Sequence, residues 1–271
     1  MLDFLFYFSI GLLFIATLLY VFSLYSPNKL FEKLAVTILF IAFFSLAGKI
    51  VFRYIQTGNT PVVSLFESLT FFAWAILGAY LLVTLKYRIN ILGVIVAPVS
   101  LILLITASTL TKDILQVSPV LKSFWFPVHV AFGFFGHSAF AIAAFAGILY
   151  LIQEKNVKKK KKNSFLNVLP PLASLDEANY LAISIGFPLF TLSIITGAVW
   201  AEYAWGTYWS WDPKQTWSLI AWFFYALILH LRLTSGWRGK KASLLSIAGF
   251  GVVIFCYLGV NILLKGLHTF R

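Results

Sequence analysis

A series of long apolar runs constrains this chain more than any other feature of its sequence. A membrane-spanning helix needs about 20 mainly apolar residues. Such runs occupy residues 3–24, 33–54, 65–86, 89–110, 125–152, 180–200, 217–233 and 243–265. Because the bilayer core offers no water to an open backbone, runs of this kind must be helical. The sequence therefore predicts an all-α polytopic membrane protein with about eight transmembrane helices.

The composition excludes several other classes of protein. Hydrophobic residues make up 61% of the chain and charged residues 11%, whereas soluble domains are about 45–50% apolar and about 25% charged. A single cysteine, Cys256, rules out an internal disulfide, a CxxC redox pair and a thiolate zinc site. The net charge of +12 comes from basic residues between apolar runs, so we expect no nucleic-acid partner.

The distribution of Lys and Arg predicts the orientation. One set of loops carries fourteen of these residues, including the run Lys158–Lys162, and the opposite side with both ends carries seven. Cytoplasmic loops are enriched in Lys and Arg, so we expect both termini to be extracytoplasmic and the first run to be a retained helix. Residues 153–179 are expected to form the one sizeable cytoplasmic loop. The whole chain, 1–271, is interpreted as a single membrane domain.

A tryptophan-rich segment joins the sixth and seventh runs on the predicted outer side. Five tryptophans lie within residues 200–217. Interfacial anchoring explains one or two indoles at a helix end, but five exceed that need. A dense set of aromatic rings suits a large, flat, apolar ligand. Asp212-Pro213 predicts a helix start at the end of the segment, because Pro is favoured in the first helical turn.

The positions of the four histidines indicate what such a ligand could be. His129 and His268 both fall on the predicted outer side, as the Trp-rich segment does. Imidazole is a common axial ligand of haem iron. His137 follows His129 by eight residues, about 12 Å along a helix, and is interpreted as a polar interhelical contact. His230 lies about 20 Å beyond Trp217 toward the cytoplasmic side and is a functional candidate because it is ionisable and lies within a span.

The segment Trp205-Gly-Thr-Tyr-Trp209-Ser-Trp211-Asp212-Pro-Lys resembles the WWD signature of haem-handling proteins of cytochrome c biogenesis. Within that superfamily the chain is most similar to the CcsA (ResC) family of System II. The resemblance covers roughly residues 58–270. Further stretches that carry it are Pro61, Phe66-Glu67-Ser68, Trp125, Leu175-Asp176-Glu177, Gly186-Phe187-Pro188, Thr196-Gly-Ala-Val-Trp200, Gly236-Trp-Arg-Gly239, Gly259-Val-Asn261 and Gly266-Leu-His268.

The resemblance implies roles for individual residues. Two extracytoplasmic histidines that hold haem iron in the family match His129 and His268, and a histidine that serves a haem within the membrane matches His230. The haem would lie against the tryptophans of the signature, Trp205, Trp209 and Trp211. Gly206 would let the loop backbone approach the ring closely, and we expect Asp212 to cap the following helix. Gln215, where the family usually has Glu, and Asn59, where His often precedes the Pro, depart from the pattern.

The function that the resemblance implies is haem export and presentation for covalent attachment to apocytochrome c. The chain would be the haem-presenting subunit of a System II cytochrome c synthase, a thioether-forming haem lyase. Its substrate would be haem b, and its partners an apocytochrome c CxxCH segment and a CcsB (ResB)-type membrane protein. The location would be the plasma (inner) membrane, or the thylakoid membrane if the chain comes from a plastid.

Two other functions stay open at the level of sequence. Four histidines could ligate two haems in a b-type electron-transfer cytochrome, although His129 and His268 lie at helix ends and that function does not require the Trp-rich segment. A small-solute transporter would need interrupted helices with polar groups at the midplane, which the apolar runs largely lack.

Overall fold

The computed structural model describes residues 2–25, 29–87, 89–111, 119–159 and 169–263. Within these ranges the chain contains helices and no strand. Eight helices are long and apolar enough to cross a membrane. The predicted all-α polytopic membrane fold is therefore confirmed.

The bounds of the helices follow the apolar runs, with extensions at several ends. The spanning helices are α1 (Leu2–Tyr25), α2 (Lys29–Thr57), α3 (Leu65–Tyr87), α4 (Gly93–Ser108), α5 (Trp125–Lys158), α7 (Leu172–Trp205), α8 (Pro213–Thr234) and α9 (Lys240–Ile254). Short 3-10 turns precede α4 (η1, Asn90–Leu92) and α5 (η2, Pro119–Lys122). A π-helical turn (η3, Phe255–Gly259) and the short α10 (Val260–Leu263) continue α9.

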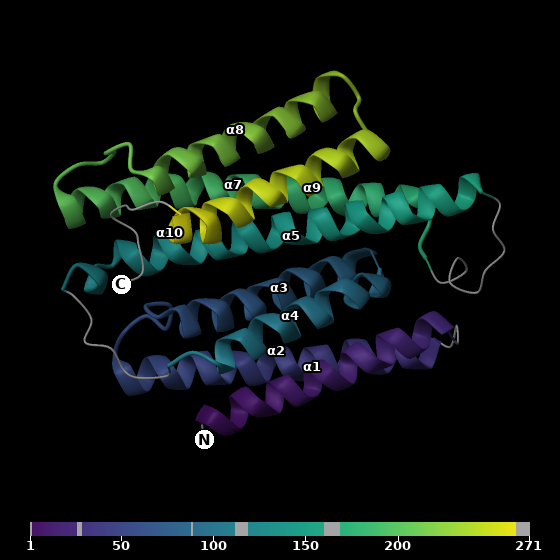
Figure 1. Cartoon of the computed structure of the whole chain (residues 1–271), viewed down its shortest axis with the longest axis horizontal. Coiled ribbons are helices and arrows are strands. Elements are labelled where there is room, and N and C mark those ends of the chain that lie inside the picture. Colours follow the sequence, from purple (N-terminus) through teal and green to yellow (C-terminus); the bar gives the residue numbers. More distant parts are fainter. Residues whose placement is uncertain (1, 26–28, 88, 112–118, 160–168, 264–271) are drawn as a thin grey trace.

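The helices lie side by side along the long axis of the molecule (Figure 1). Helices α1–α4 form one group and α5, α7, α8 and α9 form the other, with α3 in contact with α5 between them. The α7–α8 loop, the start of α5 and the end of α10 lie at one end, on the left of Figure 1. We call this end the Trp end, and the opposite end, with the α1–α2, α3–α4 and α8–α9 turns, the basic end.

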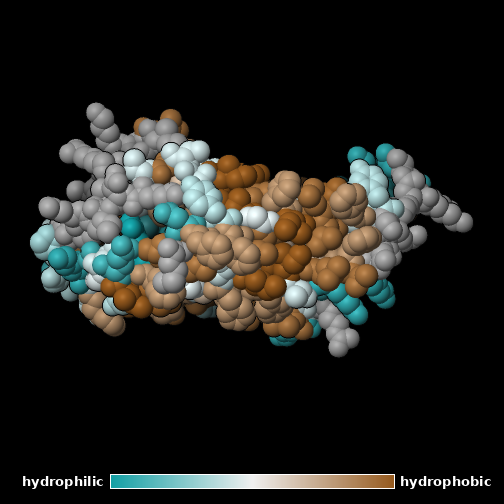
Figure 2. All heavy atoms as spheres, turned by 90° about the horizontal axis from the view of Figure 1, so that it is seen from below, coloured by the Kyte–Doolittle hydropathy of each residue, from teal (hydrophilic) through white to brown (hydrophobic). Residues whose placement is uncertain are grey.

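The surface agrees with a membrane location. On the side formed by α1 and α2, hydrophobic residues make a broad band, and hydrophilic residues gather toward the two ends (Figure 2). Large apolar side chains such as Phe44 and Ile102 are more than 60% exposed on this and other faces. A soluble monomer rarely exposes apolar surface on this scale, whereas lipid covers it in a bilayer.

The two longest helices, α5 and α7, pack closely because glycines face across their contact. A Cβ at Gly136 would lie 3.1 Å from the backbone nitrogen of Phe190, and one at Gly186 would lie 2.8 Å from the ring of Phe140. Small residues let membrane helices approach to backbone contact. This contact positions the first turns of α5 against the last turns of α7 at the Trp end.

The predicted cytoplasmic loop at residues 153–179 is wrong in its extent, because both flanking helices continue into it. Helix α7 begins at Leu172 rather than near residue 180. Neighbouring helices hold its Asn179, whose side-chain N–H groups donate to the Ala143 carbonyl at 2.7 Å and to Ser246 Oγ at 2.6 Å. A helix can carry such polar residues because groups on neighbouring helices form hydrogen bonds with them.

An ion pair joins three elements at the basic end. Both carboxylate oxygens of Asp176 accept from Arg232, each at 2.8 Å, and Oδ1 also accepts from the backbone N–H of Gly239 at 2.7 Å. The two side chains are only 10% and 13% exposed. The pair therefore links α7, α8 and the turn before α9.

We predict that Arg232→Met destabilises the protein, because it leaves the Asp176 carboxylate poorly solvated and without its counter-charge. The free energy of unfolding should fall by about 3 kcal/mol, the cost of breaking a buried pair. Thermal unfolding of the detergent-solubilised chain measures this. Lys158→Met is the control, because Lys158 pairs with Glu154 at 2.8 Å but is 67% exposed, and exposed pairs contribute about 0–1 kcal/mol. Equal melting temperatures for the two variants would contradict the assignment.

Candidate functional site

The Trp-rich loop is bounded by two helix caps that the local sequence dictates. Helix α7 ends at Trp205, where Gly206 adopts a left-handed conformation (φ 73°) and its N–H bonds to the Glu202 carbonyl. Glycine is favoured here because a Cβ is strained at positive φ. Helix α8 begins at Pro213, and Asp212 Oδ1 accepts from the Lys214 N–H at 2.9 Å. The predicted cap by Asp212 is confirmed.

Gln215 holds the middle of the loop. Its Oε1 accepts from the backbone N–H of Ser210 at 2.9 Å and from Ser210 Oγ at 3.1 Å. Asp212 and Gln215 are both buried beneath the loop. Gln215, noted in the sequence as a departure from a family pattern, is therefore an anchor that supplies a neutral acceptor.

Four of the five indoles of residues 200–217 form two edge-to-face pairs rather than one flat layer. Trp209 and Trp211 have ring centroids 5.8 Å apart and planes at 88°, and Trp205 meets Trp200 at 4.9 Å and 70°. Trp211 is 69% exposed and has a φ of 58°. A bulky residue at positive φ is strained, and such strain is concentrated at functional sites.

His129 lies in the first turns of α5, where its ring is fixed by α7. Its Nδ1 lies 2.8 Å from the Ser193 carbonyl oxygen. A carbonyl can only accept, so Nδ1 carries the proton in this bond. The Nε2 atom then carries the lone pair, and this is the arrangement that metal-binding histidines use: one ring N–H donates to a carbonyl and the other nitrogen binds the metal.

Two further residues shape the position of this ring. The planes of His129 and Trp200 are 6° apart, with centroids at 6.2 Å. A Cβ at Gly197 would lie 2.6 Å from His129 Nδ1, so only glycine leaves room for the imidazole. Trp200 also donates from Nε1 to the Val120 carbonyl at 3.2 Å. A continuous aromatic contact therefore joins His129 through Trp200 to Trp205 and the loop.

The second predicted outer histidine, His268, lies outside the described residues. The last described helix, α10, ends at Leu263 at the Trp end (Figure 1). Among the described residues, the structure brings His129 together with Trp200 and, through Trp200, with Trp205.

His137 lies two turns farther along α5 than His129. Its ring packs on Phe190, with centroids 5.1 Å apart. Its Nε2 is buried and has no hydrogen-bond partner within the described part of the chain. The polar interhelical contact expected from the sequence is therefore an aromatic contact here.

His230 occupies a different environment from the one that the sequence predicts. It was expected inside the span as a buried ionisable group, but it is exposed on the surface of α8. It shares that face with Ile220, Phe223 and Leu227, which are 42–59% exposed. Helix α8 is also the least enclosed span, with 17% of its most apolar window buried. An ionisable ring on the outward, apolar face of a spanning helix is unusual, because such residues normally face the interior of a bundle.

Residue-type reasoning alone did not identify Ser193 or Gly197 as parts of the site, and it included Trp200 in the Trp-rich segment without its contact with His129. Gly197 and Trp200 lie in the stretch Thr196-Gly-Ala-Val-Trp200, which carried part of the family resemblance. Their role depends on contact between α5 and α7 across 64 residues of chain. Local rules cannot reveal such a contact.

Comparison with known proteins identifies a family for this chain. A family model described as Cytochrome C assembly protein matches residues 62–268. The cytochrome c biogenesis protein CcsA of Chlamydomonas reinhardtii is 41% identical over 227 residues, which are 80% of this chain and 63% of that protein. The CcsA of Guillardia theta is 41% identical over 238 residues, 80% of this chain and 79% of that protein. The CcsA of Prochlorococcus marinus (strain NATL1A) is 38% identical over 254 residues, 83% and 81% of the two chains.

A solved structure shares the fold. Cytochrome c Heme Lyase CcmF superposes with a TM-score of 0.67 at 15% sequence identity, covering 95% of this chain and 48% of that chain. The chain therefore spans about half the length of this structural neighbour. At this identity the likeness concerns the helix arrangement alone.

We predict that Gln215→Leu loosens the Trp-rich loop, because it removes the acceptor of the Ser210 N–H. Leaving a donor unpaired costs about 1–3 kcal/mol, so hydrogen exchange should accelerate in residues 206–212 while α8 stays protected. Exchange measured by mass spectrometry tests this. Ser218→Ala is the matched control, since Ser218 bonds only to the Gln215 carbonyl at 2.7 Å. Unchanged exchange in Gln215→Leu would show that the loop does not depend on this anchor.

Proposed function

The chain belongs to the cytochrome c assembly protein family, and we propose that it holds haem at the Trp end for attachment to apocytochrome c. The observation that carries the proposal is the hydrogen bond from His129 Nδ1 to the Ser193 carbonyl. This bond selects the tautomer that a haem ligand needs and fixes the direction of the ring. Haem is the substrate here, not a resident cofactor.

The proposed ligand set combines His129 with His268. His129 binds the iron of haem b through Nε2. His268, which lies outside the described residues, is assigned to the opposite axial position from the family resemblance alone. Imidazoles on both faces keep the iron six-coordinate and leave the edge of the porphyrin open to an incoming protein.

The Trp-rich loop supplies the surface that the porphyrin contacts. Trp205 is linked to His129 through Trp200, and Trp209 and Trp211 extend from the loop. A Cβ built at Gly206 meets nothing within 4 Å, so the backbone there is open to a flat ligand. Asp212 contributes by capping α8 beneath the loop rather than by touching the substrate.

The chemistry of attachment takes place on the substrates, and this chain positions one of them. Each thiol of an apocytochrome c CxxCH segment adds its S–H across one vinyl C=C bond of haem, which forms a thioether without a net oxidant or reductant. The histidine of the same segment then replaces one protein ligand. The chain is thus the haem-presenting subunit of a cytochrome c synthase, and its contribution is positioning.

His230 is proposed to serve a second haem position within the membrane. It lies on the exposed face of α8, toward the basic end, far from His129 along the bundle. A CcsB (ResB)-type membrane protein covering that face would supply the second ligand. Haem would enter there and pass to the Trp end, which makes the chain part of a haem export route.

The orientation and location are proposed from charge. The described Lys and Arg residues beside the α1–α2, α3–α4, α5–α7 and α8–α9 connections lie at the basic end, and they include Lys29, Lys86, Lys158 and Arg238. The positive-inside rule assigns this end to the cytoplasm. The Trp end and both termini are then extracytoplasmic. This orientation fits a plasma membrane, or a thylakoid membrane in a plastid, because apocytochrome c would meet haem outside the cytoplasm.

We predict that His129→Ala abolishes haem retention at the Trp end and holocytochrome c formation. Both quantities should fall by more than the roughly 10–100-fold loss that follows when an outer-shell partner of a metal ligand is disturbed. Added imidazole should restore part of both, because it fills the vacant axial position. Haem staining of the cytochrome and the Soret absorbance of the purified chain measure the two effects.

The control for this experiment is His137→Ala, which removes an imidazole from the same helix. His137 packs on Phe190 inside the bundle, so its loss should leave most holocytochrome c formation intact. Normal maturation in His129→Ala, or equal loss in both variants, would contradict the assignment of His129.

We predict that haem at His230 becomes low-spin and six-coordinate only when the CcsB-type partner is present. Neither His129 nor His137 can be the second ligand of a haem bound to His230, because both lie toward the Trp end. Optical spectra of the reduced chain, purified alone and with the partner, measure the spin state. His230→Ala should also deplete the Trp-end haem, whereas Leu227→Ala on the same face should not. Two low-spin haems in the lone chain would instead favour a b-type electron-transfer cytochrome.

A further inference from the structure

Ser193 contacts His129 through both of its oxygen atoms. Its carbonyl oxygen lies 2.8 Å from His129 Nδ1, and its side-chain Oγ lies 3.2 Å from the same nitrogen. The hydroxyl also donates to the backbone carbonyl of His129 at 3.0 Å. One buried residue of α7 therefore holds both the ring and the backbone of a residue of α5 that lies 64 positions away in the chain.

The two carbonyls fix the donor and acceptor roles in this contact. A carbonyl oxygen only accepts, so the Ser193 hydroxyl proton is directed to the His129 carbonyl and the Nδ1 proton to the Ser193 carbonyl. The lone pairs of the hydroxyl oxygen then face Nδ1. The Nδ1 proton is thus shared between two acceptors of one residue, the carbonyl at 2.8 Å and Oγ at 3.2 Å.

The hydroxyl at position 193 differs from the other hydroxyls nearby on α7. Thr191 and Thr196 each donate to the carbonyl four residues earlier in their own helix, at 2.8 and 2.7 Å. This is the ordinary bond of a hydroxyl within a helix. Ser193 instead directs its hydroxyl across to α5. Any residue at this position would supply the carbonyl, but the second acceptor requires a side chain such as serine or threonine.

Two glycines leave room for the contact. A Cβ at Gly133, one turn after His129, would lie 3.0 Å from Ser193 Oγ. A Cβ at Gly197, one turn after Ser193, would lie 2.6 Å from His129 Nδ1. Each helix thus carries a glycine one turn beyond its own member of the pair, and both helices contribute to the space that the pair occupies.

Hydrogen bonds at Nδ1 change what Nε2 offers to a metal. An acceptor that draws on the Nδ1 proton raises the basicity of the ring and makes Nε2 a stronger donor. Ferric iron gains more from a stronger donor than ferrous iron does, because it carries the higher charge. Hydrogen bonding beyond the axial ligand is therefore one of the factors that set the reduction potential of a haem.

We propose that Ser193 is a positioning residue for His129, and that its hydroxyl holds the ring before haem binds and strengthens electron donation from Nε2 to the iron. The inference rests on the proposed function, in which Nε2 of His129 binds haem iron at the Trp end. Ser193 acts through His129 and not on the haem itself. Its hydroxyl thereby favours the ferric state of the haem that the chain presents.

The reduction potential of the Trp-end haem tests the proposal. The full chain is purified alone in detergent, loaded with haem, and titrated while its low-spin absorbance is followed. Ser193→Ala removes one of the two acceptors and should weaken binding of ferric relative to ferrous haem about threefold, as expected for one modest hydrogen bond. That ratio raises the midpoint potential by about 30 mV, at 59 mV per tenfold change for one electron. Ser193→Thr keeps the hydroxyl and should keep the wild-type potential.

Ser246→Ala is the matched control. Ser246 is buried on α9 and accepts from Asn179 of α7 at 2.6 Å. The variant makes the same chemical change and also removes a hydrogen bond between helices, so a general loosening of the bundle would appear in it as well. Its potential should be that of wild type. An unchanged potential in Ser193→Ala, or an equal shift in Ser193→Thr or Ser246→Ala, would overturn the proposal.

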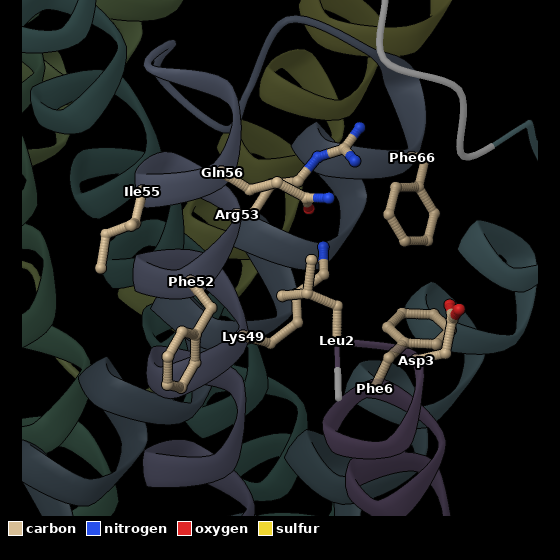
Figure 3. A pocket seen from close by; sticks show the side chains of 9 residues that line it. All are labelled: Leu2, Asp3, Phe6, Lys49, Phe52, Arg53, Ile55, Gln56 and Phe66. Atoms are coloured by element: carbon tan, nitrogen blue, oxygen red, sulfur yellow. The ribbon is translucent and has the colours of Figure 1, made fainter.

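Haem bound elsewhere would not imitate this result. A cavity of about 540 Å³ lies between the start of α1, the last turns of α2 and the start of α3 (Figure 3), and its described lining contains no histidine. Haem in that cavity would lack an imidazole ligand. Its spectrum would therefore differ from the low-spin spectrum of a haem with two imidazoles, which is the one followed in the titration.

Nitrogen-15 NMR of the haem-free chain, labelled at histidine, examines the ring directly. Wild type should show His129 protonated at Nδ1, and Ser193→Ala should speed the exchange of this proton with solvent. Wild-type exchange in Ser193→Ala would show that the hydroxyl does not hold the ring, which contradicts the proposal.

Failure of this inference and failure of the proposed function give different results. If His129→Ala loses the low-spin haem while Ser193→Ala keeps the wild-type potential, His129 is the ligand and only the role of Ser193 is wrong. If His129→Ala keeps the low-spin haem at its wild-type potential, His129 is not the ligand, and the inference is wrong together with the function on which it rests.

Discussion

The absence of water from the bilayer core is the constraint on which the rest of this structure depends. Backbone groups must be satisfied within helices, so polar side chains are expected at helix ends or in pairs, and a polar side chain on an outward-facing apolar surface is the exception. The structure contains all three cases. The Trp-rich loop and His129 lie at the end of the bundle, Asp176 and Arg232 are paired between helices at 2.8 Å, and His230 lies on an exposed apolar face of α8.

Local rules predicted those parts of the structure that depend on neighbouring residues. The apolar runs located all eight spans, and Asp212-Pro213 located the start of α8. The rules failed where distant residues decide the outcome. Asn179 falls within the stretch predicted as a loop, but it belongs to α7 and bonds to Ala143 and Ser246 of neighbouring helices. The rotation of α8, which exposes His230, is set by packing and has no signature in the histidine itself.

The site shows the same division between local and long-range information. The WWD-like stretch indicated the aromatic loop, and residue type indicated His129. The tautomer of His129 depends on Ser193 and the space for its ring on Gly197, both contributed by α7. The close α5–α7 contact, made possible by Gly136 and Gly186, is therefore part of the site. A membrane bundle thereby places one fixed imidazole beside a strained aromatic loop.

The most direct test of the proposed haem site is a cryo-electron microscopy map of the haem-loaded chain. We expect a flat ring density at the Trp end, with the iron bound to Nε2 of His129 and the ring in contact with Trp209 or Trp211. Ring density confined to the interior between α3 and α5, or a haem at the Trp end with His129 turned away from the iron, would contradict it.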